Sequence, residues 1–100
     1  MEMTSKIENG TMTLYAIGNL DSIGAPLLRD YLIQYETADF KKLVIDFTDV
    51  QNISSAGLRV LLSTQKQEIL NNRTIEIINI NADIHGIFKL TGLCEIMNVK

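Results

Sequence analysis

Two adjacent serines, Ser54 and Ser55, are the residues of this sequence with the clearest potential for chemistry. A serine hydroxyl can attack an acyl carbon, accept a phosphoryl group or cap a helix. The small residues Ala56 and Gly57 follow directly. An apolar run precedes the pair at 43–47 and a helical apolar period follows it, so the serines are predicted to lie on a strand-to-helix turn.

The sequence lacks the other parts of a serine hydrolase. A nucleophile elbow needs a glycine two residues before the serine, and Ile53 stands there. His85 is the only histidine and falls on a later predicted helix, where a surface or core-edge position is expected. One histidine and one cysteine make no metal-ligand pair, and no Gly-Lys or Gly-x-Gly pattern forms a phosphate loop. We therefore expect no enzyme activity, metal or cofactor.

Composition limits the class of protein. The chain has 100 residues, 46% of them hydrophobic, and one proline, which indicates one folded domain spanning 1–100. Its net charge of -3 and scattered basic residues argue against binding to nucleic acid or to a membrane surface. A single cysteine excludes a disulfide framework, and no apolar run forms a signal peptide or a membrane span. We expect a cytoplasmic protein.

Strand and helix patterns alternate along the chain. Asn9-Gly10 favours a type I′ hairpin, Asp21 and Ser22 are candidate caps for the first helix, and Asn71-Asn72 ends the second. The expected elements are the hairpin, a helix within 20–37, a strand at 42–48, a helix following the serines, a strand at 74–80, a helix at 82–92 and a short edge strand within 95–100.

This order predicts an α/β fold with a mixed sheet of four to five strands, parallel in its middle and covered by about three helices. The run at 43–47 has apolar residues at 43, 44, 45 and 47, which place apolar side chains on both faces and are typical of a strand that is covered on both faces. Ligand and partner sites in such folds gather where strand C-termini meet helix N-termini. The two serines are predicted to lie at such a junction.

Two interpretations of the turn follow from the residues themselves. One serine caps the helix, a contact worth about 1 kcal/mol, and the small residues let the helix start pack close to the sheet. A cap explains neither the second serine nor Gly57, because glycine within a helix costs roughly 0.5–1 kcal/mol relative to alanine. We therefore favour the second interpretation, in which Ala56 and Gly57 let a partner approach a serine hydroxyl.

Two segments together resemble the STAS family, in particular its anti-sigma-factor antagonists. LVIDFTDVQNISSAGLRVLLSTQK, at 43–66, matches an apolar strand ending in aspartate, a linker ending in an apolar residue, a serine-rich turn, Gly-Leu and an amphipathic helix. GNLDSIGAPLLRDYL, at 18–32, is similar to the Gly-x-Leu-Asp loop and first helix of that family. The resemblance covers essentially the whole chain.

The resemblance implies a partner-switching protein. Such a protein binds an anti-sigma factor that is also a serine kinase, leaves it when phosphorylated, and is restored by a serine phosphatase. The usual pattern, Asp-Ser-[Ser or Thr]-Gly-Leu, has the modified serine two residues before glycine, which is Ser55 here. Ser54 occupies the usual aspartate position and is the alternative acceptor. The expected partner-binding residues are Asp21, Ser22, Ile53, Ser54, Ala56, Gly57, Leu58 and Arg59, although Leu58 is better explained as core.

Two further expectations follow from the resemblance. The alternative function is a STAS interaction module of a lipid-transport or stress-sensing complex without a kinase cycle, which the paired serines disfavour. Many relatives continue into a C-terminal helix, whereas this sequence ends at Lys100. Apolar side chains at Ile96, Met97 and Val99 are then expected at the surface, and the protein is expected to be a monomer or weak homodimer.

Overall fold

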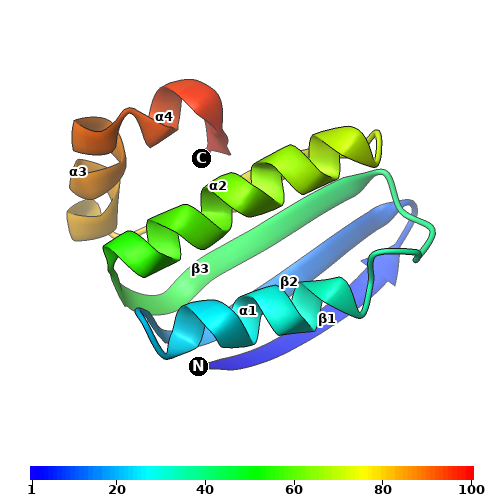
Figure 1. Ribbon diagram of the computed structural model, residues 1–100, viewed down its shortest axis with the longest axis horizontal. Coiled ribbons are helices and arrows are strands. Elements are labelled where there is room, and N and C mark those ends of the chain that lie inside the picture. The colour runs from blue at the N-terminus through cyan, green and yellow to red at the C-terminus, as the bar shows by residue number, and fades with distance from the viewer.

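The computed structural model describes all residues 1–100 and shows a five-stranded sheet with four helices (Figure 1). None of the helices is long and apolar enough to cross a membrane. In chain order the elements are β1 (Glu2–Glu8), β2 (Thr11–Leu20), α1 (Gly24–Ile33), β3 (Lys42–Ile53), α2 (Ser55–Leu70), β4 (Thr74–Ile78), α3 (Ala82–Thr91), α4 (Leu93–Ile96) and β5 (Asn98–Val99).

The sheet has the mixed topology predicted from the order of the elements. Its strand order is β1-β2-β3-β4-β5, with β1 and β2 antiparallel and all other neighbours parallel. Asn9 and Gly10 have φ of 52° and 79°, the two positive values that a type I′ turn requires. The hairpin and the α/β class are therefore confirmed.

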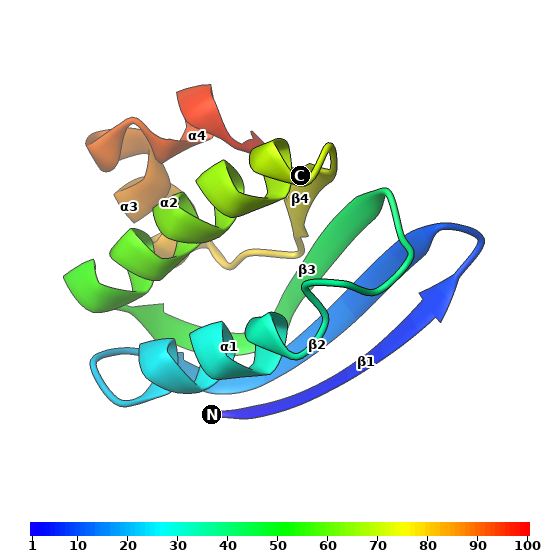
Figure 2. The same cartoon turned by 45° about the vertical axis from the view of Figure 1, so that its right-hand side comes forward.

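The helices lie on one side of the sheet only (Figure 2). Leu43, Ile45 and Phe47 of β3 point into the core beneath them. On the opposite face Tyr15 and Ile17 of β2 are 39% and 45% exposed. The prediction of a central strand covered on both faces is therefore wrong.

Val44 accounts for the misleading apolar pattern. It lies on the open face of the sheet and is nevertheless only 8% exposed. Its register partners on the two neighbouring strands are Thr13 and Glu76. Glu76 forms ion pairs with Lys42 at 3.5 Å and Lys100 at 3.2 Å, so polar side chains of the sheet itself stand around this valine. A central strand can thus bury an apolar residue without a covering helix.

The long strand β3 leads directly into α2. The segment 49–53, expected as a linker, continues the strand and pairs with the end of β2, where Leu20 is in register with Ile53. The backbone N–H of Ser54 then donates to the Leu20 carbonyl at 3.0 Å, and α2 begins one residue later. The turn is short and fully tied to the neighbouring strand.

Gly57 is small because the start of α2 packs against the end of β2. A Cβ atom at Gly57 would lie 2.2 Å from the Leu20 carbonyl oxygen and 2.8 Å from the Ile53 side chain. Gly24, at the start of α1, stands in the same relation to the Asn19 carbonyl oxygen, also at 2.2 Å. Gly57 is itself buried, so the interpretation that it opens a path for a partner is wrong. The packing interpretation is confirmed.

The C-terminal residues form α4 and β5, and β5 adds a parallel edge strand beside β4. The short edge strand expected within 95–100 is confirmed, whereas α4 was not predicted. Ile96 is 57% exposed as expected, but Met97 is only 3% exposed and belongs to the core. Met97 is buried because the turn of α4 directs it toward the sheet, so its predicted exposure is wrong.

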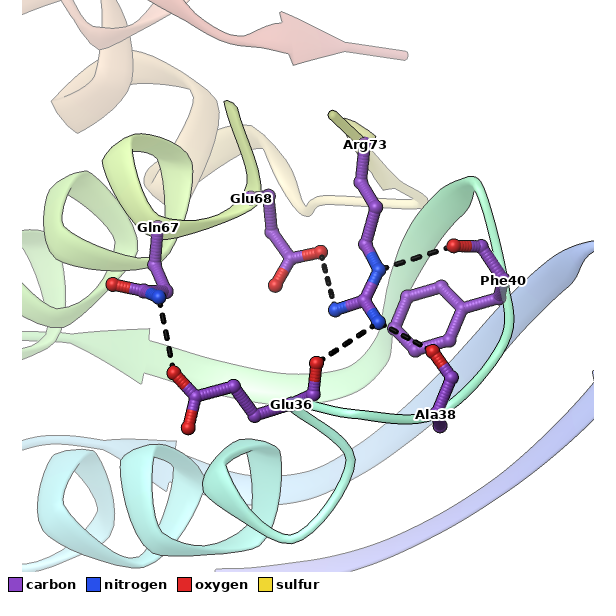
Figure 3. A network of polar contacts seen from close by, with 6 residues as sticks. All are labelled: Glu36, Ala38, Phe40, Gln67, Glu68 and Arg73. Carbon is purple, nitrogen blue, oxygen red and sulfur yellow. Dashed lines mark hydrogen bonds and ion pairs between the residues drawn. The ribbon is translucent and has the colours of Figure 1, made fainter. Parts of the chain in front are cut away.

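A buried arginine fixes the other end of α2 (Figure 3). Arg73 donates from Nε to the Phe40 carbonyl at 3.1 Å, and from Nη2 to the carbonyls of Ala38 at 2.5 Å and Glu36 at 3.1 Å. Its Nη1 lies 3.5 Å from the Glu68 carboxylate, and the guanidinium stacks 3.7 Å from the Phe40 ring centroid. One side chain thereby joins α2 to the loop that links α1 with β3.

Replacing Gly57 by alanine is expected to destabilise the fold. The new methyl group would overlap the Leu20 carbonyl oxygen, and overpacking of this kind costs about 1–3 kcal/mol. Gly86 in α3 has no atom within 4 Å of an added Cβ and is the matched control. Gly86→Ala should instead stabilise by about 0.5–1 kcal/mol. Chemical denaturation measures both, and a Gly57→Ala protein as stable as the parent would contradict the packing argument.

Replacing Arg73 by methionine should lower the free energy of unfolding by about 3–5 kcal/mol at pH 7, because Glu68 would stay buried without its partner. Burial raises the pKa of the Glu68 carboxyl more than the Arg73 guanidinium lowers it. A raised folded-state pKa gives stability that is present below the unfolded-state value and is lost as pH rises. The Arg73→Met loss should therefore be smaller at pH 4 than at pH 7. Arg73→Met/Glu68→Gln is the control and should lack this pH dependence.

Candidate functional site

The candidate site lies at the sheet edge where β2 and β3 end and α1 and α2 begin. Besides the Ser54–Leu20 backbone bond, the Asn52 amide donates to the Asn19 side-chain oxygen at 3.3 Å, which joins the two strand ends again. Residues around Asp21 and around Ser55, far apart in the chain, are therefore neighbours in space. This confirms the predicted meeting of strand C-termini and helix N-termini.

The two serines have different surroundings. Ser54 occupies the N-cap position of α2, with φ of -108° and ψ of 178°, but its hydroxyl forms no capping hydrogen bond. The Oγ atom of Ser54 is buried and has no hydrogen-bond partner. Ser55 is the first residue of the helix and is exposed. The predicted serine cap is therefore wrong, and of the two hydroxyls the one on Ser55 belongs to an exposed residue.

Asp21 shapes the neighbouring turn. Its Oδ1 accepts hydrogen bonds from the backbone N–H groups of Gly24 at 2.8 Å and Ile23 at 3.0 Å, as a capping residue for α1 does. These backbone hydrogen bonds, that of Gly24 first, hold the pKa of the Asp21 carboxyl below its usual value. The N-cap position of α1 is Ile23, so the Asp21 carboxylate does not occupy the cap itself but holds the loop just before the helix. Ser22 makes no such bond and is exposed.

The remaining predicted partner-binding residues differ in how much of each is exposed. Ile53 is only 9% exposed and belongs to the core cluster, so it is not available at the rim. Ala56 and Leu58 are half-buried and pack on that core. Arg59 is exposed. The surface around Ser55 is therefore polar at Ser22 and Arg59, and Ala56 and Leu58 are only partly accessible there.

Two features of this surface were missed. Ile23 is 74% exposed in the turn before α1, although an isoleucine near the start of a helix would be predicted to be buried. A groove of about 470 Å³ also runs between α1 and α2, with Arg29 and Arg59 among its lining residues. A single sequence does not show which two helices lie side by side. It therefore contains no signal that Arg29 of α1 and Arg59 of α2 line the same groove.

His85 is exposed on α3 and lines a separate small cavity with Ile80, Asn81, Ala82, Val99 and Lys100. No residue of α2 contributes to that cavity. The histidine and the serines are thus parts of different surfaces of the molecule. The chemistry available at the turn is that of an exposed hydroxyl at a helix N-terminus.

Comparisons with known proteins, by sequence and by fold, point to one family. The family model described as the STAS domain matches residues 2–100. The anti-sigma-B factor antagonist of Listeria monocytogenes serovar 1/2a is 25% identical over 87 residues, which cover 87% of this chain and 76% of the relative.

Two solved structures show the same fold. The anti-sigma factor antagonist from Mycobacterium paratuberculosis has a TM-score of 0.86 at 20% identity, over 98% of this chain and 83% of the other. The Bacillus cell fate determinant SpoIIAA in its phosphorylated form has a TM-score of 0.74 at 14% identity, over 99% and 91%. With the family model spanning all but the first residue, the chain belongs to the STAS domain family.

Proposed function

We propose that this protein is an anti-sigma-factor antagonist whose binding is controlled by phosphorylation of Ser55. The observation that carries the proposal is the exposed hydroxyl-bearing residue at the first position of α2, beside a buried Ser54 hydroxyl. The likeness to the Listeria antagonist, over most of both chains, supports the same function. The partner would be an anti-sigma factor with serine kinase activity, and the protein would act by binding it.

Phosphorylation of this turn is compatible with the fold. The kinase would transfer the γ-phosphoryl group of ATP to the Ser55 Oγ: a P–O bond to the serine forms, the bond to ADP breaks, and the kinase takes the hydroxyl proton. The product carries about -1.5 to -2 charge at neutral pH. The N-terminus of a helix has unpaired N–H groups and a partial positive charge, both of which favour an anion.

The effect of the phosphate would be local to the binding surface. Ser55, Ser22, Ile23 and Arg59 are exposed around the same sheet edge. An anti-sigma factor that contacts these residues closely would bury a new dianion without supplying a partner of opposite charge, and leaving a buried charge unpaired costs several kcal/mol. A serine phosphatase would restore binding by transferring the phosphoryl group to water. The antagonist would then again occupy the anti-sigma factor and free its sigma factor.

The phosphorylation site can be assigned with single variants. Incubated with the cognate kinase and ATP, the parent should gain one phosphate, and Ser55→Ala should gain none. Ser54→Ala is the matched control and should be labelled like the parent, because its hydroxyl is buried. Intact-mass spectrometry and peptide mapping give the result. Labelling of Ser55→Ala, or labelling lost only in Ser54→Ala, would contradict the assignment to Ser55.

A charge at position 55 should separate binding from folding. Ser55→Asp should change the free energy of unfolding by no more than about 1 kcal/mol, since a helix N-terminus tolerates negative charge. Its affinity for the anti-sigma factor should fall by at least about tenfold. Thr37→Asp adds the same charge in an exposed turn beyond the other end of α1 and should bind like the parent. Calorimetric titration measures both, and an unfolded Ser55→Asp protein would contradict a local effect.

A further inference from the structure

Arg59 stands one helical turn beyond Ser55 on the same side of α2. The helix has 16 residues and begins at Ser55, so positions 55 and 59 are in an i, i+4 relation. Residues so spaced have Cβ atoms about 5–6 Å apart. Helical side chains also lean toward the N-terminus of their helix, which directs the long Arg59 side chain toward the turn that carries Ser55. Both residues are exposed.

The guanidinium of Arg59 has no partner in the unmodified protein. It takes part in none of the five ion pairs and in no side-chain hydrogen bond. The first turn of α2 contains no acidic residue. Arg29 of α1 lines the same groove and is paired with its neighbour Asp30 at 3.5 Å.

The two carboxylates that line the same groove are already engaged. Glu36 accepts a hydrogen bond from the Gln67 amide at 3.0 Å, and Glu68 is paired with buried Arg73. Both bonds lie at the far end of α2, about two turns beyond Arg59. Arg59 is therefore an exposed cation near the hydroxyl, and neither carboxylate of the groove is paired with it.

We propose that Arg59 binds the phosphate of phosphorylated Ser55 within the same chain. This inference rests on the proposed phosphorylation of Ser55. An acid at position i and a base at i+4 is the favourable orientation of a helical ion pair, and the guanidinium fork matches two phosphate oxygens. Phosphorylation then changes the partner-binding surface twice, because it adds a dianion and also withdraws the positive charge of Arg59 from the partner.

The interaction between Arg59 and the Ser55 phosphate can be measured without kinase or anti-sigma factor. Phosphoserine is incorporated at position 55 during translation, and the thermal midpoint is compared with that of the unmodified chain. The phosphorylated and unmodified forms are also made of Arg59→Gln, of Arg59→Lys, and of Lys66→Gln. Lys66 is an exposed cation farther along α2. We expect the change in midpoint caused by phosphoserine to be more stabilising in the parent than in Arg59→Gln, by about 1–4 °C. Lys66→Gln should match the parent, and Arg59→Lys should retain part of the difference.

Two further readings complete the test. The difference between parent and Arg59→Gln should vanish near 1 M salt, where the screening length is about 3 Å. The Arg59 Nε–H resonance should move on phosphorylation, whereas that of buried Arg73 should not. Equal midpoint changes in parent and Arg59→Gln, or an effect of Lys66→Gln as large, would overturn the proposal. Because neither enzyme nor partner is present, a failure of the proposed function would appear separately, as absent kinase labelling or absent binding.

Discussion

The arrangement of the turn depends on the close contact between the start of α2 and the end of β2. The Leu20 carbonyl oxygen accepts the Ser54 N–H at 3.0 Å and leaves no room for a Cβ at Gly57. This contact sets how deep the helix start lies and how it is rotated about its axis. The Ser54 hydroxyl is consequently turned into the protein, and Ser55, the next residue, is left at the surface.

The opposite end of α2 is held by chemistry of another kind. Arg73 binds three carbonyls of the loop between α1 and β3 and pairs with Glu68 in the last turns of the helix. Three backbone oxygens would otherwise lack this donor, and buried polar groups without partners are costly. Steric contact thus holds α2 at one end and a hydrogen-bonded cation holds it at the other, which fixes the position of the surface at its N-terminus.

Local chemistry made several elements predictable from sequence. Asn9-Gly10 specified the hairpin, Asp21 the start of α1, and Gly92, with φ of 77°, the end of α3. Other features depend on contacts between distant segments. Gly57 faces a carbonyl 37 positions earlier in the chain, and Arg73 reaches a loop more than 30 positions away. The open sheet face was missed because Val44 is buried by neighbouring strands and leaves an apolar pattern like that of a covered strand.

Stability and the proposed switch use different residues of the same short turn. Gly57 and Ile53 are buried and fix the backbone, and the Asp21 carboxylate is occupied by two backbone N–H groups. The exposed residues around Ser55 are Ser22, Ile23 and Arg59, and Ser55 itself lies at the positive end of α2. Although the net charge of the chain is -3, a phosphate on Ser55 would meet the positive end of α2 and the proposed contact with Arg59. The proposed phosphate on Ser55 would alter what the surface binds while leaving the contacts that hold the fold unchanged.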